Sequence, residues 1–168
     1  MKKIILSLLL LPTFVLADNL NSLTIGYGQL DGALTDLAGS DNIDGISVGF
    51  TSGSNKAIFD IEHWQATGDD DGWQTWANVA FAFDDFSTGS MYAGLAGTDG
   101  DILDDEFGLV LGYQKRSDQG TDYNFSATSY DGYVVYGIDV IAQNGLSLSI
   151  NDYANAMTVM QIGYSFSY

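Results

Sequence analysis

Residues 107–114 read FGLVLGYQ, a stretch in which the odd positions carry large apolar side chains. The even positions carry glycine, glutamine and one valine, Val110. Because successive side chains of a β-strand point to opposite faces, this period of two predicts a strand with one strongly apolar face. The same alternation recurs at residues 45–51 and 146–151. The sequence therefore predicts an all-β protein.

Turn signals between such runs divide the chain into ten segments. They cover residues 22–30, 43–52, 56–67, 73–84, 89–98, 105–116, 122–130, 132–142, 145–152 and 156–168. A tilted strand needs roughly eight to twelve residues to cross a bilayer, and an even count brings both termini to one side. We therefore predict a transmembrane antiparallel up-and-down β-barrel of ten strands. Eight strands is the alternative, and the very short hairpin at Asp131-Gly132 is the weakest point of the count.

The connections between the segments are of two kinds. Short turns are expected on the periplasmic side, at residues 52–55, 85–88, 117–121 and 143–145. Acid-rich loops are expected on the extracellular side, at residues 31–42, 68–72, 98–104 and 152–155. The only proline is Pro12, so every segment can donate to a hydrogen-bond ladder. The 20 glycines are expected mainly at inward or bulge positions, where they let strands curve and close.

The N-terminus has the layout of a secretory signal peptide. Lys2 and Lys3 precede an apolar run at 4–16, which is too short to span a bilayer as a helix, and the small residue Ala17 follows. We expect cleavage after Ala17, which leaves residues 18–168 as one exported barrel domain. The chain has no cysteine, so a hydrogen-bond ladder or a core must supply the rigidity that disulfides give other exported proteins.

The charge balance is strongly acidic, with a formal net charge of −17. Beyond the signal peptide only Lys56, Lys115 and Arg116 oppose 22 Asp and Glu residues, which argues against binding to nucleic acid. High net charge together with low hydrophobicity is typical of disordered chains, but 46% of the residues of this chain are apolar. The acidic residues are therefore expected to be segregated from the apolar face.

The chain ends in QIGYSFSY, residues 161–168. Its polar residue, glycine and two aromatic residues stand at Gln161, Gly163, Phe166 and Tyr168. This ending resembles the C-terminal β-signal of outer-membrane proteins, and the resemblance implies recognition by the barrel-assembly machinery of a Gram-negative-type cell envelope. The layout of the whole mature chain is similar to the OmpA-like transmembrane-domain superfamily and its ten-stranded relatives. Only fold and outer-membrane location follow from this resemblance.

Strand parity selects four charged residues for the barrel interior. Asp60, Glu62 and Trp64 face inward on the third segment, and the alternation also turns Arg116 on the sixth segment and Asp139 on the eighth inward. Because a small barrel is filled with side chains, buried acids there must pair with cations, share protons or meet water. We predict a polar network of these four charged residues as a structural plug, with a proton relay or a catalytic pair as the alternative.

His63 is the only histidine and stands beside Glu62. Outer-membrane enzymes use a rim histidine near acids as a general base, but parity points His63 outward, toward the aromatic girdle. Trp64, Trp73 and Trp76 could form a ligand platform, yet girdle anchoring explains them without a ligand. We therefore predict no catalytic residue.

Acid-rich clusters lie at residues 69–72, 99–101 and 104–106. Their carboxylates suit Ca²⁺ or Mg²⁺, but none has the spacing of an EF-hand loop. We expect these clusters to be solvent-exposed loops. The alternative is that they bind divalent cations loosely and that these cations bridge to lipopolysaccharide phosphates. We predict no dedicated metal site and no cofactor.

Three functions follow from these patterns, in decreasing order of support. The first is a structural or surface-interaction role through acidic extracellular loops, in a monomer whose partners are outer-membrane lipid and lipopolysaccharide. The second is a narrow, porin-like channel for small solutes or ions. The predicted interior holds both small and bulky side chains, so the sequence does not decide whether it conducts. The third is an outer-membrane enzyme.

Overall fold

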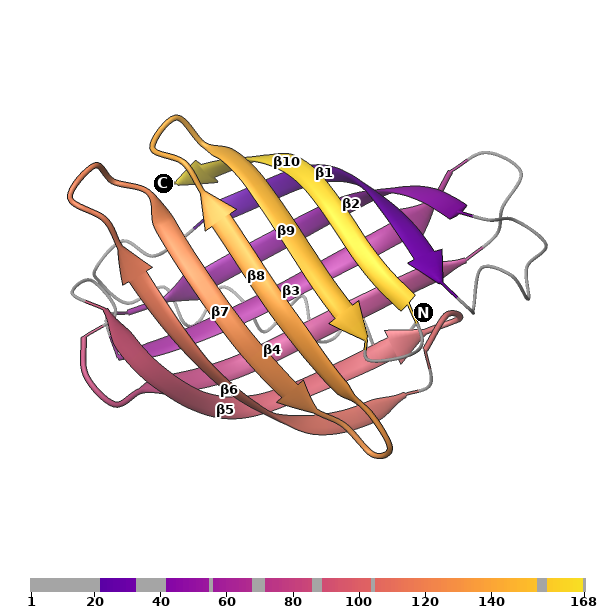
Figure 1. Cartoon of the computed structure of the whole chain (residues 1–168), viewed down its shortest axis with the longest axis horizontal. Coiled ribbons are helices and arrows are strands. Elements are labelled where there is room, and N and C mark those ends of the chain that lie inside the picture. Colours follow the sequence, from indigo (N-terminus) through magenta and orange to yellow (C-terminus); the bar gives the residue numbers. More distant parts are fainter. Residues whose placement is uncertain are drawn as a thin grey trace.

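The computed structural model of the chain describes residues 22–32, 42–54, 56–67, 72–85, 89–103, 105–153 and 157–167. Ten strands run through this part: β1 (Ser22–Gly32), β2 (Asn42–Gly53), β3 (Ala57–Ala66), β4 (Trp73–Ala82), β5 (Ser90–Gly100), β6 (Glu106–Arg116), β7 (Asp122–Ser129), β8 (Val134–Ile141), β9 (Leu146–Tyr153) and β10 (Met157–Ser167). Each pairs antiparallel with its sequence neighbours, and β10 closes the barrel on β1 (Figure 1). The ten-strand prediction is confirmed, and the alternative of eight strands is wrong.

The doubtful hairpin between β7 and β8 forms a tight connection. The Tyr130 amide donates to the Tyr133 carbonyl at 3.0 Å, and Gly132 has a φ of 93°. That left-handed conformation favours glycine, which has no Cβ to clash. β8 consequently begins at Val134, slightly later than the pattern predicted.

The barrel has two distinct ends. The terminal end is the one at which β1 begins and β10 ends, and the loop end is the opposite one. The predicted signal peptide at residues 1–17 lies outside the described residues, as do 33–41, 68–71, Asp104, 154–156 and Tyr168. Among the described residues no helix has the length and apolarity required to cross a membrane.

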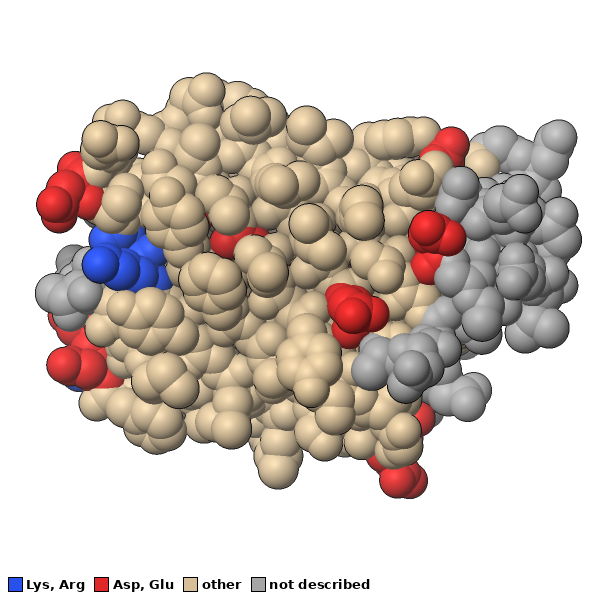
Figure 2. All heavy atoms as spheres, viewed as in Figure 1, with Lys and Arg blue, Asp and Glu red and all other residues tan. Residues whose placement is uncertain are grey.

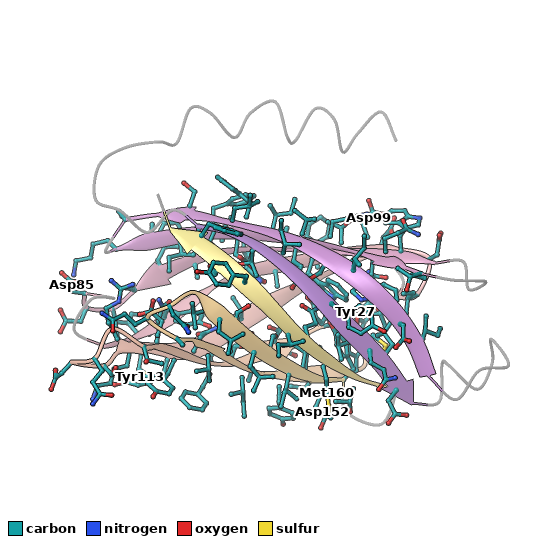
Figure 3. All side chains as sticks on the ribbon, turned by 90° about the horizontal axis from the view of Figure 1, so that it is seen from above. Tyr27, Asp85, Asp99, Tyr113, Asp152 and Met160 are labelled. Atoms are coloured by element: carbon teal, nitrogen blue, oxygen red, sulfur yellow. The ribbon has the colours of Figure 1, made fainter. Side chains whose placement is uncertain are left out.

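The outer face of the wall is apolar. Large hydrophobic side chains stand exposed on every strand except β3, whose Phe59 and Ile61 are half-buried. In the view of Figure 2 charged side chains gather toward the two ends, and the surface between them is mostly uncharged. In Figure 3 the labelled Asp85 lies at the terminal end, whereas Asp99 and Asp152 lie toward the loop end. The acidic residues are thus segregated, as the composition requires.

Glycines make room for aromatic rings inside the barrel. A Cβ at Gly45 would lie 2.1 Å from the ring of Trp64, and one at Gly112 would lie 2.2 Å from the ring of Tyr92. Real Cβ contacts are not this short, so a larger residue at either position would displace the ring. These glycines therefore allow large side chains to fold across the lumen.

Candidate lumen site

The lumen contains a cavity of about 280 Å³ that is lined by residues from all ten strands. Asp60, Glu62 and Asp139 line it and remain partly accessible, beside asparagine and serine side chains and, over the larger part of the wall, apolar and aromatic ones. Among the described residues, no Lys or Arg belongs to this lining. The cavity, called the chamber below, is therefore a mixed polar and apolar space whose charged groups are carboxylates.

Buried apolar side chains fill the lumen toward its loop end. Trp64 is 0% exposed, and Leu30 and Val159 are each 1% exposed. They belong to an apolar cluster that also includes Tyr153 and Met157. Water that occupies the chamber consequently meets an apolar plug in the direction of the loop end.

Hydrogen-bond donors stand beside the chamber carboxylates. The Thr51 hydroxyl donates to Asp60 Oδ1 at 2.8 Å. Asp139 accepts from Asn124 Nδ2 at 2.9 Å and from the Ser149 hydroxyl at 2.6 Å. These donors stabilise the charged form of each acid without neutralising it.

A chain of polar side chains extends this network around the wall. The Tyr92 hydroxyl donates to Asn124 Oδ1 at 2.8 Å, and Asn151 Nδ2 donates to the Ser149 hydroxyl at 3.1 Å. Parity alone places Asn124 and Ser149 on the inner face, so the signal that could have found them was present in the sequence. The sequence prediction covers only charged residues and does not include these neutral ones.

Arg116 does not join the three carboxylates. Its guanidinium is bidentate with Asp122, with both N–O distances at 2.7 Å. Arg116 is the last residue of β6 and stands directly opposite Asp122, so it lies at the terminal end of the barrel. The predicted network of Arg116 with Asp60, Glu62 and Asp139 is therefore corrected. The alternation of side chains indicates the face of the strand on which a residue lies, but it does not give the height of that residue along the barrel axis.

Supplying the missing cation should stabilise the barrel. Asn78 lines the cavity and stands opposite Asp60, so Asn78→Lys can place an ammonium group among the carboxylates. We expect a gain of about 1–3 kcal/mol in the free energy of unfolding, because hydrogen bonds to charged groups are the stronger ones. Urea unfolding in lipid vesicles measures it. Asn78→Met is the control of similar length without charge, and an equal gain in that variant would show that added apolar packing is the cause.

The aromatic residues divide between the two faces of the wall. His63 faces outward, with Nδ1 2.9 Å from the Thr75 hydroxyl and its ring 5.9 Å from that of Trp73. The girdle prediction is wrong for the two other tryptophans, because Trp64 is fully buried and Trp76 lines the cavity. Both share the inward parity of Asp60, and Trp76 lies 6.4 Å from Tyr153.

The residues of the predicted assembly signal lie along β10, apart from Tyr168, which is not described. Gln161 faces the lumen and accepts a hydrogen bond from the Ser47 hydroxyl at 3.2 Å. A Cβ at Gly163 would lie 2.6 Å from the Ile25 carbonyl, so only glycine fits there. Phe166 is 49% exposed on the outer face, where its ring lies 4.7 Å from that of Tyr164.

The acid-rich clusters are described only in part, since Asp69, Asp70, Asp71 and Asp104 lie outside the described residues. Among the described residues no three His, Asp or Glu side chains are grouped closely enough to hold a metal ion.

No family model matches the chain, and no curated protein is found to resemble it. The class that the molecule itself defines is the closed, ten-stranded, antiparallel up-and-down barrel, here with carboxylates in its chamber.

Proposed function

We propose that the chain is a small β-barrel of the Gram-negative-type outer membrane, with a structural or surface-interaction role through its acidic loop end. The observation that carries this proposal is the apolar outer face. Exposed side chains such as Phe107 at 91%, Leu109 at 65% and Leu95 at 63% would be unfavourable in water but are suited to a bilayer. The ending at residues 161–168 supports insertion by the barrel-assembly machinery.

The distribution of charge suggests an orientation. All Lys and Arg of the described residues, namely Lys56, Lys115 and Arg116, stand at the terminal end. The described residues of the loop end include Asp31, Asp44, Asp99, Asp101, Asp105, Glu106, Asp131 and Asp152, without any cation. We propose that the terminal end faces the periplasm and the acidic loop end faces outward. Loosely bound divalent cations would then bridge its carboxylates to lipopolysaccharide phosphates.

The barrel in its described state should be silent in planar bilayers, because the apolar plug blocks the loop end of the lumen. We expect no sustained conductance from the purified protein, together with a shift in gel mobility on boiling in detergent. Sustained, salt-dependent conductance from most inserted molecules would favour the second candidate function, a narrow channel. The water-accessible chamber is the observation that keeps this second function in view. Absence of the gel shift would argue against a membrane barrel of either kind.

We propose no catalytic role. The contacts of His63 with Thr75 and Trp73 suit an interfacial ring, and a test is direct. Turnover of peptide or phospholipid by the parent protein, abolished in His63→Ala, would contradict this part of the proposal.

A further inference from the structure

We propose that the chamber is a binding site for a small organic cation of the alkylated ammonium class. Its carboxylates balance the charge of the ligand, and the aromatic rings on its loop-end side contact the alkyl groups. This inference goes beyond the proposed structural role, because it gives the lumen a ligand. It does not depend on the membrane location, since the folded barrel can be tested in detergent.

The carboxylates face the chamber from opposite walls. Asp60 and Glu62 lie two positions apart on β3, and Asp139 lies on β8. β3 and β8 stand five strands apart in the closed ring of ten, so they lie on opposite sides of the lumen. The described residues that line the space between them include no Lys or Arg. Because enclosed carboxylates are costly without a compensating positive charge, a cationic ligand is the complement that this chamber lacks.

Aromatic rings line the same chamber on its loop-end side. Trp76 on β4 and Tyr153 at the end of β9 lie with their ring centroids 6.4 Å apart. These two strands also stand on opposite sides of the closed ring, so the pair meets across the lumen. Tyr130 adds a third ring to the lining, and Trp76 stands directly opposite Glu62 on the neighbouring strand. Aromatic rings beside carboxylates are suited to alkylated ammonium groups, which ring faces attract electrostatically.

An inorganic cation fits this lining less well. Ca²⁺ takes about six to eight oxygen ligands, and among the described residues no three His, Asp or Glu side chains are grouped closely enough to hold a metal ion. The apolar and aromatic part of the wall suits alkyl groups instead. The volume of about 280 Å³ lies below the roughly 300–1,000 Å³ of sites for drug-sized ligands, so the ligand must be small.

The chamber is reached from the terminal end of the barrel. Ile141, the last residue of β8, and Gln114, near the end of β6, both line the cavity. Both residues are only half-buried, so solvent reaches this part of the lumen. Binding from this side requires no movement of the apolar cluster that fills the loop end. In the proposed orientation the ligand comes from the periplasm.

Titration of the folded barrel in detergent with choline chloride tests the site. The comparison ligand is the neutral isostere of choline, in which a tert-butyl group replaces the trimethylammonium group. Isothermal titration calorimetry at constant ionic strength should show saturable binding of choline, roughly tenfold or more tighter than that of the neutral alcohol, because only the cation gains from the carboxylates and the rings. Equal affinity for the two compounds, or no binding of choline, would overturn the proposal.

A cation placed in the chamber by substitution should compete with the ligand. Asn78 lines the cavity and stands opposite Asp60. Asn78→Lys should weaken choline binding by roughly tenfold or more, because like charges in an enclosed site repel each other. Asn78→Met, of similar length without the charge, should bind choline nearly as the parent does. An equal loss in the two variants, or no loss in Asn78→Lys, would contradict the role of the carboxylates.

The aromatic wall is tested by Trp76→Leu, which keeps an apolar side chain but removes the ring. It should weaken choline binding by roughly fivefold or more and leave binding of the neutral alcohol nearly unchanged. Trp73→Leu is the matched control, because Trp73 lies on the outer face of the same strand with its ring 5.9 Å from that of His63. Equal choline affinity in the two variants would contradict the aromatic contact.

The heat-dependent gel shift shows whether the parent and each variant are folded barrels. If Trp76→Leu does not fold, the comparison of Asn78→Lys with Asn78→Met still tests the site. A folded parent that binds no choline would overturn this inference and leave the proposed membrane location standing. That location is tested separately, by insertion into lipid.

Discussion

Replacing Leu111 by arginine is expected to lower the free energy of unfolding in phospholipid bilayers by about 2–4 kcal/mol. Leu111 is the middle residue of β6, is 55% exposed on the outer face, and stands between Ala93 and Ala127 on the neighbouring strands. If the apolar belt faces lipid, the arginine must lose hydration or deform the bilayer to reach water. Urea titration of the barrel in vesicles, followed by tryptophan fluorescence, measures the difference.

The matched control places the same charge at the rim. Phe83 follows β4 at the terminal end and is 72% exposed, so Phe83→Arg should cost only about 0–1 kcal/mol near the interface. In water, an exposed leucine and an exposed phenylalanine could both be replaced by arginine at a cost within about 0.5 kcal/mol. Equal, small effects at the two positions would therefore contradict a lipid-facing belt.

The wall of the barrel could be predicted because its signal is local. The period of two at residues 107–114 reports which side chains share a face, and the lengths of such runs give the strand count. Even the hairpin at Asp131-Gly132 follows from turn chemistry, since its glycine takes the left-handed conformation that the turn needs. None of these inferences requires knowledge of a distant contact.

The contents of the lumen could be predicted only by face. The alternation of side chains turns both Arg116 and Asp139 inward, yet Arg116 pairs with Asp122 at the terminal end. The height of a residue in a barrel depends on strand register and tilt, which are properties of the closed sheet and not of one segment. The alternation of side chains along the third segment also turns Trp64 toward the interior, and Gly45 makes room there for its ring. The expectation that Trp64 belongs to the aromatic girdle therefore conflicted with the alternation pattern of its own strand.

The contact between Gln74 and the residues after β5 had no sequence signal. Gln74 reads as one inward polar residue among several, and residues 101–103 show no periodicity that would bring them to it. Their association includes a hydrogen bond between the Gln74 side chain and the Leu103 backbone amide, 29 positions away. A contact of this kind becomes visible only when the strands have been brought together.

Trp64→Ala is expected to give the largest loss of stability of the changes considered, about 3–5 kcal/mol in the free energy of unfolding. The indole is 0% exposed and packs in the apolar cluster at the loop end, against the open side of Gly45. Removal of the ring leaves a cavity that the ladders of β2 and β3 prevent the wall from filling. Denaturant unfolding in vesicles, followed by far-ultraviolet circular dichroism, avoids dependence on the lost fluorophore.

Trp64→Phe separates the packing of the ring from its polar group. Trp64 Nε1 is buried and has no hydrogen-bond partner among the described residues. Phenylalanine loses part of the ring volume but also removes this unpartnered N–H, and the two effects oppose each other. We expect a loss of roughly 1.5 kcal/mol or less. If Trp64→Phe were as destabilising as Trp64→Ala, packing by a ring of phenylalanine size would not stabilise the loop end, which would contradict this prediction.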